Sequence, residues 1–297
     1  MTYYDDTTIV FLNGEWLKAK DAQTNLYVQG LHYGNSVFEG IRSYQTRAGE
    51  TQIFKAEEHY ERLHYSASKM FIPLPYSVAE LTDISYQLLQ KNGLSDAYLR
   101  PLVFAGSNMS LTTPAESHLF LCAWQWGKLL GDKLVHLMTS SFQRPNPKSC
   151  FVDAKVSGHY VNSILAATEA KAKGFDEALL LDADGHVAEA PGANFFFEKD
   201  DVLYTPPRGN ILPGITRGTM LQLCRQAGIR VEERAFTIEE VKQGDGAFLV
   251  GTAAEVTGIE SLDGVPFQRP WANTFGAALQ QMYQKLVLDE VLHEAYL

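Results

Sequence analysis

The sequence is poor in cysteine and has no long hydrophobic run. Its three cysteines, Cys122, Cys150 and Cys224, lie far apart in 297 residues and form no Cys-x-x-Cys pair. Such a dispersed, odd set excludes a disulfide framework or a cysteine-based zinc site and predicts reduced thiols. No apolar stretch approaches the roughly 20 residues that span a bilayer. The first residues also lack the basic and apolar regions of a signal peptide. We therefore expect a cytoplasmic chain with no membrane partner.

Positive charge is also scarce. Twenty-five Lys and Arg residues face 35 Asp and Glu residues, which gives a formal net charge of −10 and argues against a nucleic-acid partner. No Gly-x-Gly-x-x-Gly motif follows a predicted strand, which excludes a dinucleotide-binding enzyme of that type. A few arginines gathered in one place can still bind an anionic small molecule. The length allows one large domain or two.

Hydrophobic periodicity and turn signals predict strands and helices without a regular βαβ rhythm. In the first half we expect a hairpin over 8–18 around Asn13-Gly14, strands at 52–54, 97–104 and 118–123, and helices over 56–70 and from the Ser77–Glu80 capping box to Gly93. In the second half we expect strands at 134–140, 177–181, 194–198, 202–204 and 247–250, and helices after Tyr160, Thr216 (as N-cap) and Thr237 and over 272–297. This mixture predicts a two-domain α+β or α/β chain: a small α+β domain over 1–126, a linker at 127–133 and a large domain over 134–297.

Three polar residues stand out in this framework. Lys155 precedes Ser157-Gly158 and a helix-like run, and a desolvated lysine at such a boundary forms Schiff bases. Taken alone, Lys155 is better explained as a solvated surface amine, as is any one of the fourteen lysines. Tyr98 and Arg100 are two residues apart on a predicted strand, so their side chains share a face and suit a carboxylate, or merely a half-exposed surface.

Six motifs surround and include these residues in a fixed order. They are His32–Arg42, Arg62–His64 and Ala97–Pro101 before Lys155, and Glu189–Phe197, Leu212–Arg217 and Gly251–Glu255 after it. Over about residues 11–267 the chain resembles the class IV pyridoxal-phosphate aminotransferases, most closely the branched-chain amino acid aminotransferases. The resemblance implies the fold type IV architecture of that family, also found in D-amino acid aminotransferases.

The resemblance implies a site for pyridoxal 5′-phosphate (PLP) and no metal. Lys155 would bind PLP covalently and then act as catalytic base and acid, Glu189 would face the pyridine nitrogen, and Tyr160 would contact the phenolic oxygen. The phosphate would be held by Arg62, the Ile215 and Thr216 amides, Gly251 and Thr252. Glu189 follows Lys155 by 34 residues (189 − 155), which is the interval found in the family.

The same resemblance implies a substrate site. Phe38 and Trp126 would wall an apolar pocket, while Tyr98, Arg100 and the Ala253 amide would bind a carboxylate. Tyr33 and the loop Met109–Leu111 would reach a neighbouring subunit, which implies a homodimer or a higher homo-oligomer. The sequence departs from the common family pattern at Leu129, His159, Ala190, Pro191 and Ala193, and these departures leave the preferred amino acid open.

We therefore expect a PLP-dependent transaminase that moves the amino group of branched-chain L-amino acids (leucine, isoleucine, valine) to 2-oxoglutarate. The alternatives are a D-amino acid aminotransferase, an aminodeoxychorismate lyase, or a non-catalytic oligomeric binding protein of the same fold. The pair Tyr98 and Arg100 speaks against the first two. Retention of Lys155, Tyr160, Glu189 and Arg62 together speaks against the third.

Overall fold

The chain folds into two compact units, each described here by itself. The computed structural model describes residues 3–127, 129–131 and 133–288. Unit 1 comprises Met1–Trp126 and Ala154–Gly158, and unit 2 comprises Gly127–Asp153 and His159–Leu297. The short segment that contains Lys155 thus packs with unit 1, although the chain on either side of it belongs to unit 2. Within the described residues, no helix combines the length and the apolar character needed to cross a membrane.

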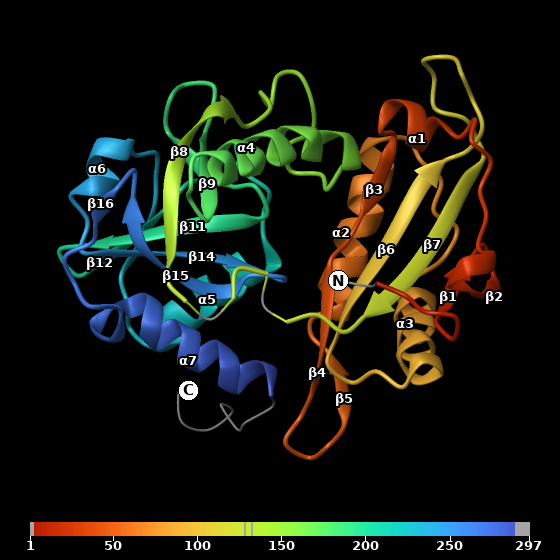
Figure 1. The fold of residues 1–297 in the computed structure, drawn as a ribbon, viewed down its shortest axis with the longest axis horizontal. Coiled ribbons are helices and arrows are strands. Elements are labelled where there is room, and N and C mark those ends of the chain that lie inside the picture. The colour runs from red at the N-terminus through yellow and green to blue at the C-terminus, as the bar shows by residue number, and fades with distance from the viewer. Residues whose placement is uncertain (1–2, 128, 132, 289–297) are drawn as a thin grey trace. The chain divides into compact units, whose positions relative to one another are not determined.

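Unit 1 is built on a seven-stranded antiparallel sheet with the order β2-β1-β7-β6-β4-β5 (Figure 1). Strand β3 pairs with the second half of β6 and strand β4 with its first half, so β3 and β4 succeed one another along the same neighbour. The strands are β1 (Ile9–Leu12), β2 (Glu15–Lys18), β3 (Ser36–Phe38), β4 (Ile41–Gln45), β5 (Thr51–Ile53), β6 (Ala97–Ala105) and β7 (Ser117–Trp124). The helices are α1 (Gln29–Tyr33), α2 (Ala56–Lys69) and α3 (Val78–Asn92), with a 3₁₀ turn at Ala19–Asp21.

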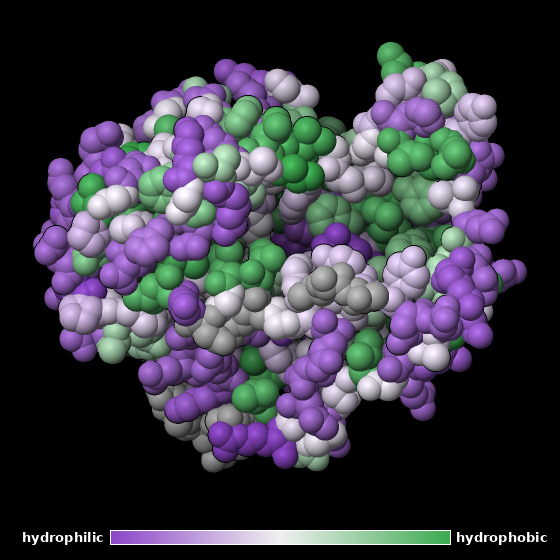
Figure 2. All heavy atoms as spheres, viewed as in Figure 1, coloured by the Kyte–Doolittle hydropathy of each residue, from purple (hydrophilic) through white to green (hydrophobic). Residues whose placement is uncertain are grey.

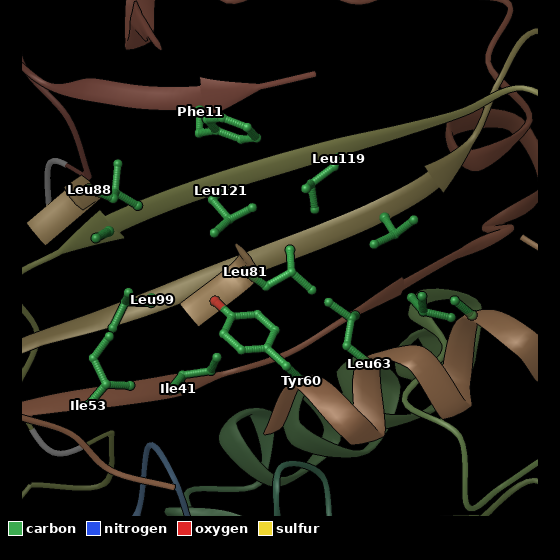
Figure 3. Packing of buried hydrophobic residues seen from close by; sticks show 14 of the residues in the cluster. Phe11, Ile41, Ile53, Tyr60, Leu63, Leu81, Leu88, Leu99, Leu119 and Leu121 are labelled. Carbon is green, nitrogen blue, oxygen red and sulfur yellow. The ribbon is translucent and has the colours of Figure 1, made fainter. Parts of the chain in front are cut away.

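The core of unit 1 lies between this sheet and helices α2 and α3. Figure 3 shows Tyr60 and Leu63 of α2 and Leu81 of α3 pointing toward side chains of the sheet. Because side chains alternate along a strand, the residues of β6 and β7 that enter this core are every second one: Ala97, Leu99, Val103 and Ala105, with Leu119, Leu121 and Ala123. The intervening side chains of β6 and β7 therefore lie on the opposite face of the sheet.

Unit 2 contains a sheet that closes on itself. Eight of its nine strands follow the order β10-β9-β8-β15-β14-β11-β12-β13, and the ninth, β16, pairs with β15. An additional β10–β11 pairing joins six of the strands into a ring. The strands are β8 (Val135–Gln143), β9 (Glu177–Leu181), β10 (Val187–Ala190), β11 (Ala193–Lys199), β12 (Val202–Thr205), β13 (Val231–Glu233), β14 (Gly246–Gly251), β15 (Glu255–Leu262) and β16 (Val265–Pro266). The helices are α4 (Tyr160–Ala172), α5 (Ile215–Gln226), α6 (Ile238–Lys242) and α7 (Phe275–Val287), with a 3₁₀ turn at Trp271–Asn273. A further 3₁₀ turn, Ser157–His159, begins in unit 1 and ends in unit 2.

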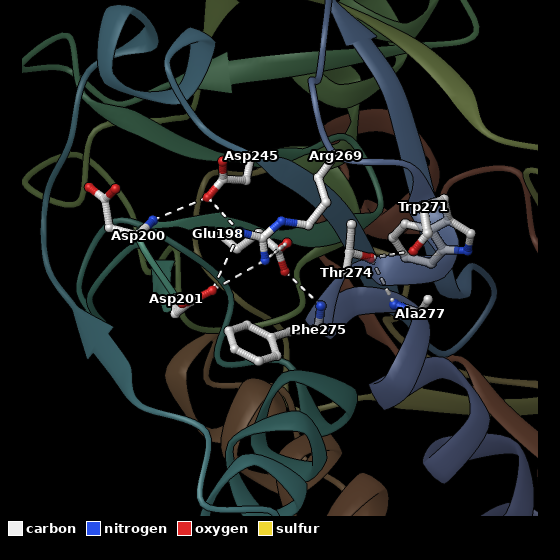
Figure 4. Close-up of polar contacts among 9 residues, drawn as sticks. All are labelled: Glu198, Asp200, Asp201, Asp245, Arg269, Trp271, Thr274, Phe275 and Ala277. Atoms are coloured by element: carbon white, nitrogen blue, oxygen red, sulfur yellow. Dashed lines mark hydrogen bonds and ion pairs between the residues drawn. The ribbon is translucent and has the colours of Figure 1, made fainter.

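An ion network around the buried Glu198 joins β11 to the start of α7. Arg269 reaches Glu198 (3.1 Å), Asp245 (3.1 Å) and Asp201 (3.4 Å), as Figure 4 shows. Glu198 is 1% exposed and also accepts a hydrogen bond of 2.7 Å from the Phe275 amide in the first turn of α7. The carboxylate thus satisfies an N–H that has no partner within the helix, and Arg269 offsets its charge.

One helix begins earlier than the sequence indicated. Thr216 was expected to be an N-cap, but α5 starts at Ile215 and its N-cap is Gly214, with φ −64° and ψ 135°. A side chain at Gly214 would overlap the Asn194 amide, which packs against that position. Tertiary packing therefore fixes the start of α5, and Thr216 is the second helical residue. Of the helix expected over 272–297, α7 covers Phe275–Val287, and residues 289–297 lie outside the described part of the chain.

Candidate active site

Four of the predicted site residues cluster in unit 1, three of them on the face of the sheet opposite helices α2 and α3. The Arg100 guanidinium carbon lies 4.6 Å from the centroid of the Phe38 ring. The Arg100 Nη2 donates to the Tyr98 hydroxyl (3.2 Å). The Trp126 ring meets the Tyr98 ring edge to face, with centroids 4.9 Å apart. The prediction that Tyr98 and Arg100 share a face is confirmed, and the result is a guanidinium and a phenol set among aromatic rings.

Lys155 is anchored to this cluster through both its backbone and its side chain. Its N–H donates to the Ser66 hydroxyl of α2 (2.9 Å), and its carbonyl accepts from the Phe38 amide of β3 (3.1 Å). The next residue, Val156, forms a β-bridge with Val37. The amine Nζ lies 4.9 Å from the centroid of the Phe38 ring. Strand β3 and helix α2 therefore fix the backbone position of Lys155 and place its side chain beside the Phe38 ring.

Arg62 lies on α2 and binds a buried carboxylate that the sequence did not point out. Its Nε donates to Glu39 Oε1 (2.6 Å) and its Nη2 to Glu39 Oε2 (2.9 Å). His59, three residues earlier on the same helix face, shares Glu39 Oε2 through its Nδ1 (2.7 Å). Arg62, His59 and Ser66 thus form one polar face of α2, directed at Glu39 and at the backbone of Lys155.

Tyr33 ends α1 and is 49% exposed. Its hydroxyl donates to the carbonyl of Met109 (3.3 Å) in the β6–β7 loop. The structure therefore brings together the two segments that were expected to act jointly, Tyr33 and the loop around Met109–Leu111.

Unit 2 supplies the predicted carboxylate on a buried strand. Glu189 lies on β10 and is 5% exposed. It accepts hydrogen bonds from Asn194 Nδ2 (2.9 Å) and from the Leu212 amide (3.1 Å). Arg144 Nε lies 2.9 Å from Glu189 Oε1 as an ion pair, with its N–H not aligned for a hydrogen bond. These contacts give the carboxylate a fixed orientation.

The predicted phosphate-binding amides begin α5, next to this carboxylate. Because Ile215 and Thr216 are the first two residues of the helix, their N–H groups have no intrahelical acceptor and favour an anion. Asn194 links the two features, since its Nδ2 also donates to the Leu212 carbonyl (3.0 Å) just before the helix.

Gly251, Thr252 and Ala253 lie at the turn between β14 and β15. A Cβ at Gly251 would come 3.0 Å from the Gly192 carbonyl, so the backbones of the two loops approach closely there. The Ala253 carbonyl accepts from the Leu129 amide (2.9 Å). The bond from Leu129 thus occupies the Ala253 carbonyl of the turn.

Tyr160 begins α4, and its predecessor His159 is half-buried. Burial and the nearby Arg144 guanidinium both lower the pKa of His159, so the imidazole is neutral near pH 7. His159 is therefore a neutral polar group at the start of α4.

The functional groups present fit PLP. An aldehyde needs an amine, a protonated pyridine nitrogen needs a carboxylate, and a phosphate needs a guanidinium and free amides. Lys155 and Arg62 of unit 1 and Glu189 and the start of α5 in unit 2 supply this set of donors and acceptors. Among the described residues, no group of three or more His, Cys, Asp or Glu side chains is arranged to hold a metal ion.

Sequence reasoning missed the residues that hold these groups in place. Glu39 stands inside the motif His32–Arg42, and Asn194 inside the motif Glu189–Phe197. Only its neighbours indicate that Glu39 is buried, because it stands in an apolar stretch with Val37, Phe38 and Ile41. For Ser66 and Arg144 we find no signal in the sequence.

Comparison with known proteins assigns the family. The family model "Amino-transferase class IV" matches residues 36–262. The branched-chain-amino-acid aminotransferase of Pseudomonas aeruginosa is 39% identical over 293 residues, which cover 97% of this chain and 95% of that protein. Among solved structures, the branched-chain aminotransferase of Thermoproteus uzoniensis with norvaline superposes with a TM-score of 0.92 at 35% identity, covering 97% of both chains.

A third similar protein contains the expected cofactor. The branched-chain amino acid aminotransferase from Thermobaculum terrenum in its PLP form has a TM-score of 0.90 at 31% identity, and the match covers 96% of this chain and 95% of that one. The match of the family model extends over most of the chain and includes Lys155, Glu189 and the start of α5. The chain therefore belongs to the class IV aminotransferases, with the fold type IV architecture and the PLP dependence of that family.

Proposed function

We propose that this transaminase acts on branched-chain L-amino acids with 2-oxoglutarate as the amino acceptor. The observation that carries the proposal is the cluster of Lys155, Phe38, Tyr98 and Arg100 in unit 1. There an amine lies 4.9 Å from the centroid of an apolar ring, and a guanidinium lies 4.6 Å from the same centroid. An amino acid with an apolar side chain needs these groups: one that reacts with its nitrogen, one that binds its carboxylate, and an apolar wall.

The proposed role of Lys155 follows from its anchoring. PLP, when bound, withdraws electrons from the substrate Cα and so makes its proton acidic. The Lys155 amine takes that proton and returns it at the neighbouring carbon as general base and acid. Ser66 and Phe38 hold the Lys155 backbone in place, so the amine can move only as far as its own side chain allows.

The proposed cofactor contacts are assigned residue by residue. Glu189 holds a proton on the pyridine nitrogen, and its contacts with Asn194, Leu212 and Arg144 keep the carboxylate oriented for this. Tyr160 is proposed for the phenolic oxygen. The phosphate is assigned to Arg62, the amides of Ile215 and Thr216, Gly251 and Thr252.

The proposed substrate site uses the aromatic cluster of unit 1. Phe38 and Trp126 wall the side-chain pocket, and Tyr98, Arg100 and the Ala253 amide bind the carboxylate. The 2-oxoglutarate side chain carries a second carboxylate, so the pocket also needs a polar edge, which Arg100 or a neighbouring backbone group supplies. The relatives named as branched-chain aminotransferases, one of them bound to norvaline, support an apolar substrate.

We also propose a homodimer, or a higher homo-oligomer, in which Tyr33 and the loop Met109–Leu111 reach a neighbouring copy. Hydrophobic side chains gather at the surface of unit 1 over α1 and the β6–β7 loop (Figure 2), where Leu31 is 63% and Leu111 87% exposed. Apolar side chains concentrated at a surface are typical of protein interfaces. A sedimentation experiment at micromolar concentration checks this, and a monomer would contradict it. Cys122, Cys150 and Cys224 form no disulfide, in keeping with our proposal that the protein works in the cytoplasm.

Two experiments test the catalytic proposal. Borohydride reduction of the PLP-loaded protein followed by peptide mapping should label Lys155, and a label on another lysine would refute the assignment. The loaded protein should then be titrated with leucine, isoleucine, valine, glutamate, phenylalanine and D-alanine. Leucine, isoleucine, valine and glutamate should convert the cofactor spectrum to that of the pyridoxamine form. Conversion by D-alanine without conversion by leucine would favour a D-amino acid enzyme instead.

A further inference from the structure

Glu39 lies in the gap between β3 and β4 and is fully buried, with 0% of its surface exposed. Its amide donates to the Pro101 carbonyl of β6 (2.9 Å), which fixes its backbone against the sheet. Its carboxylate accepts four hydrogen bonds: two from Arg62, one from His59 Nδ1, and one of 3.2 Å from the Gly40 amide. A buried carboxylate is costly unless it is paired and hydrogen-bonded, and here it is both.

The charges in this cluster are well defined. Burial alone would raise the pKa of Glu39, but the Arg62 guanidinium and His59 outweigh it and lower the pKa. Burial lowers the pKa of His59, and the Arg62 and Lys155 charges act in the same direction against the attraction of Glu39. The cluster is therefore a carboxylate and a guanidinium with a neutral imidazole, whose Nδ1–H we assign as the donor to Glu39.

The pairing fixes the plane of the guanidinium. Glu39 binds Arg62 in the two-point manner that matches a planar fork to a carboxylate, through Nε and Nη2. Two such bonds define the plane and rotation of the group, whereas one bond would leave it free to turn. The remaining N–H donors of a guanidinium, out of five, then project from Arg62 in set directions.

We propose that Glu39 is a positioning residue, which orients the Arg62 guanidinium for the cofactor phosphate and does not itself touch cofactor or substrate. The inference rests on the proposed role of Arg62 as phosphate ligand. His59 helps by occupying the same carboxylate oxygen as Arg62 Nη2, which holds the carboxylate against rotation. Phosphate recognition thus depends on a residue at a strand end, 23 positions before the arginine (62 − 39).

The experiment compares PLP with pyridoxal, which has the same aldehyde but no phosphate. Dissociation constants are measured for both ligands from the absorbance of the bound form, without substrate, on the full chain. In Glu39→Gln one of the two carboxylate oxygens becomes an NH2 donor, so the side chain cannot accept from both Nε and Nη2 of Arg62. We expect its affinity for PLP to fall about ten- to a hundredfold, the range for losing hydrogen bonds that hold a charged group. Its affinity for pyridoxal should change less than about threefold. Glu61→Gln, an exposed glutamate on the same helix, is the matched control and should bind both ligands like the wild type.

A second set of variants covers the case in which Glu39→Gln does not fold. Arg62→Gln removes the guanidinium, and the double variant E39Q/R62Q removes both charges of the pair. If Glu39 acts only through Arg62, E39Q/R62Q binds PLP with the same dissociation constant as Arg62→Gln. A tenfold further loss in the double variant would overturn the proposal, because Glu39 would then act by another route.

The remaining outcomes separate this inference from the proposed function. Equal losses of PLP and pyridoxal in Glu39→Gln would indicate a purely structural role and overturn the inference. Unchanged PLP binding in Glu39→Gln would overturn it as well. If the wild-type chain carries no borohydride-reducible PLP on Lys155, the proposed function fails instead, whatever Glu39 does.

Discussion

Removal of the Asn194 side chain should weaken unit 2 and loosen the carboxylate assigned to the pyridine nitrogen. Asn194 is 4% exposed on β11. Its Nδ2 donates to Glu189 Oε2 (2.9 Å) and to the Leu212 carbonyl (3.0 Å). In Asn194→Ala both acceptors lose a partner inside the protein, where water does not readily replace it.

The size of the effect follows from these two bonds. A buried acceptor left without its partner costs about 1–3 kcal/mol, and the bond to a carboxylate lies toward the upper end. We expect the free energy of unfolding to fall by roughly 2–4 kcal/mol, since Glu189 keeps its bond from the Leu212 amide and its ion pair with Arg144. For a chain of this size that corresponds to a melting midpoint lower by about 3–6 °C.

Thermal melting of the PLP-free protein, followed by circular dichroism, measures the stability change. The PLP absorbance spectrum then reports on Glu189: without a well-oriented carboxylate the bound cofactor should show less of the form protonated at the ring nitrogen. Asn273→Ala, an exposed asparagine in the same unit, is the control and should melt within about 1 °C of the wild type. If Asn194→Ala melted like this control, the reasoning that Asn194 holds Glu189 and the approach to α5 would be wrong.

Two further predictions concern a glycine and a buried acid. In Gly40→Ala the new methyl group would overlap the Tyr98 hydroxyl. We expect the KM for leucine to rise about tenfold or more, because the phenol is displaced from Arg100; steady-state kinetics would expose an error as an unchanged KM. Burial raises the pKa of Glu198 despite its bonds to Phe275 and Arg269. The folded state therefore holds this proton more tightly than the unfolded state, and stability is gained as pH falls through the raised pKa. Melting at pH 7 and pH 5 should show this gain in the wild type and not in Glu198→Gln; equal pH dependence in both would contradict it.

Local signals predicted the elements they belong to. The Ser77–Glu80 capping box is present in full at the start of α3, and Gly93 ends that helix in a left-handed conformation. The Asn13-Gly14 turn joins β1 to β2, as expected. Each of these signals involves residues within a few positions of one another, so the sequence alone contains all the interacting groups.

The stretch from 29 to 45 was the least predictable part of the fold. It forms α1, β3 and β4, none of which was expected as a helix or strand. Strand β3 has three residues, all buried, so it shows neither alternation nor enough length to be recognised. Its existence depends on pairing with β6, more than sixty residues away in the sequence.

In the candidate site, too, features that depend on neighbouring residues could be predicted, and features that depend on long-range contacts could not. That Tyr98 and Arg100 share a face could be predicted, because two residues on one strand suffice to decide it. That Glu189 is buried on β10 instead of lying at the surface could not be decided without the family motif, since the three groups that bind it come from other segments. Nothing in the sequence signals that residues 154–158 pack with unit 1, because the contacts to Ser66 and Phe38 are long-range backbone contacts.

The three consecutive residues Phe38-Glu39-Gly40 each have a different structural role that the sequence motif does not reveal. They lie where β3 ends and before β4 begins, both strands pairing with β6. Phe38 places its ring beside Lys155 and Arg100, Glu39 turns to α2 and binds Arg62, and Gly40 leaves room for the Tyr98 hydroxyl. In a continuous strand, Phe38 and Gly40 would point to one face of the sheet and Glu39 to the opposite face. Here Glu39 points toward Arg62, the arginine assigned to the phosphate. One short gap in a strand can therefore set the amine, the phosphate ligand and the carboxylate-binding pair relative to one another, which is a reason for its sequence to be restricted at all three positions.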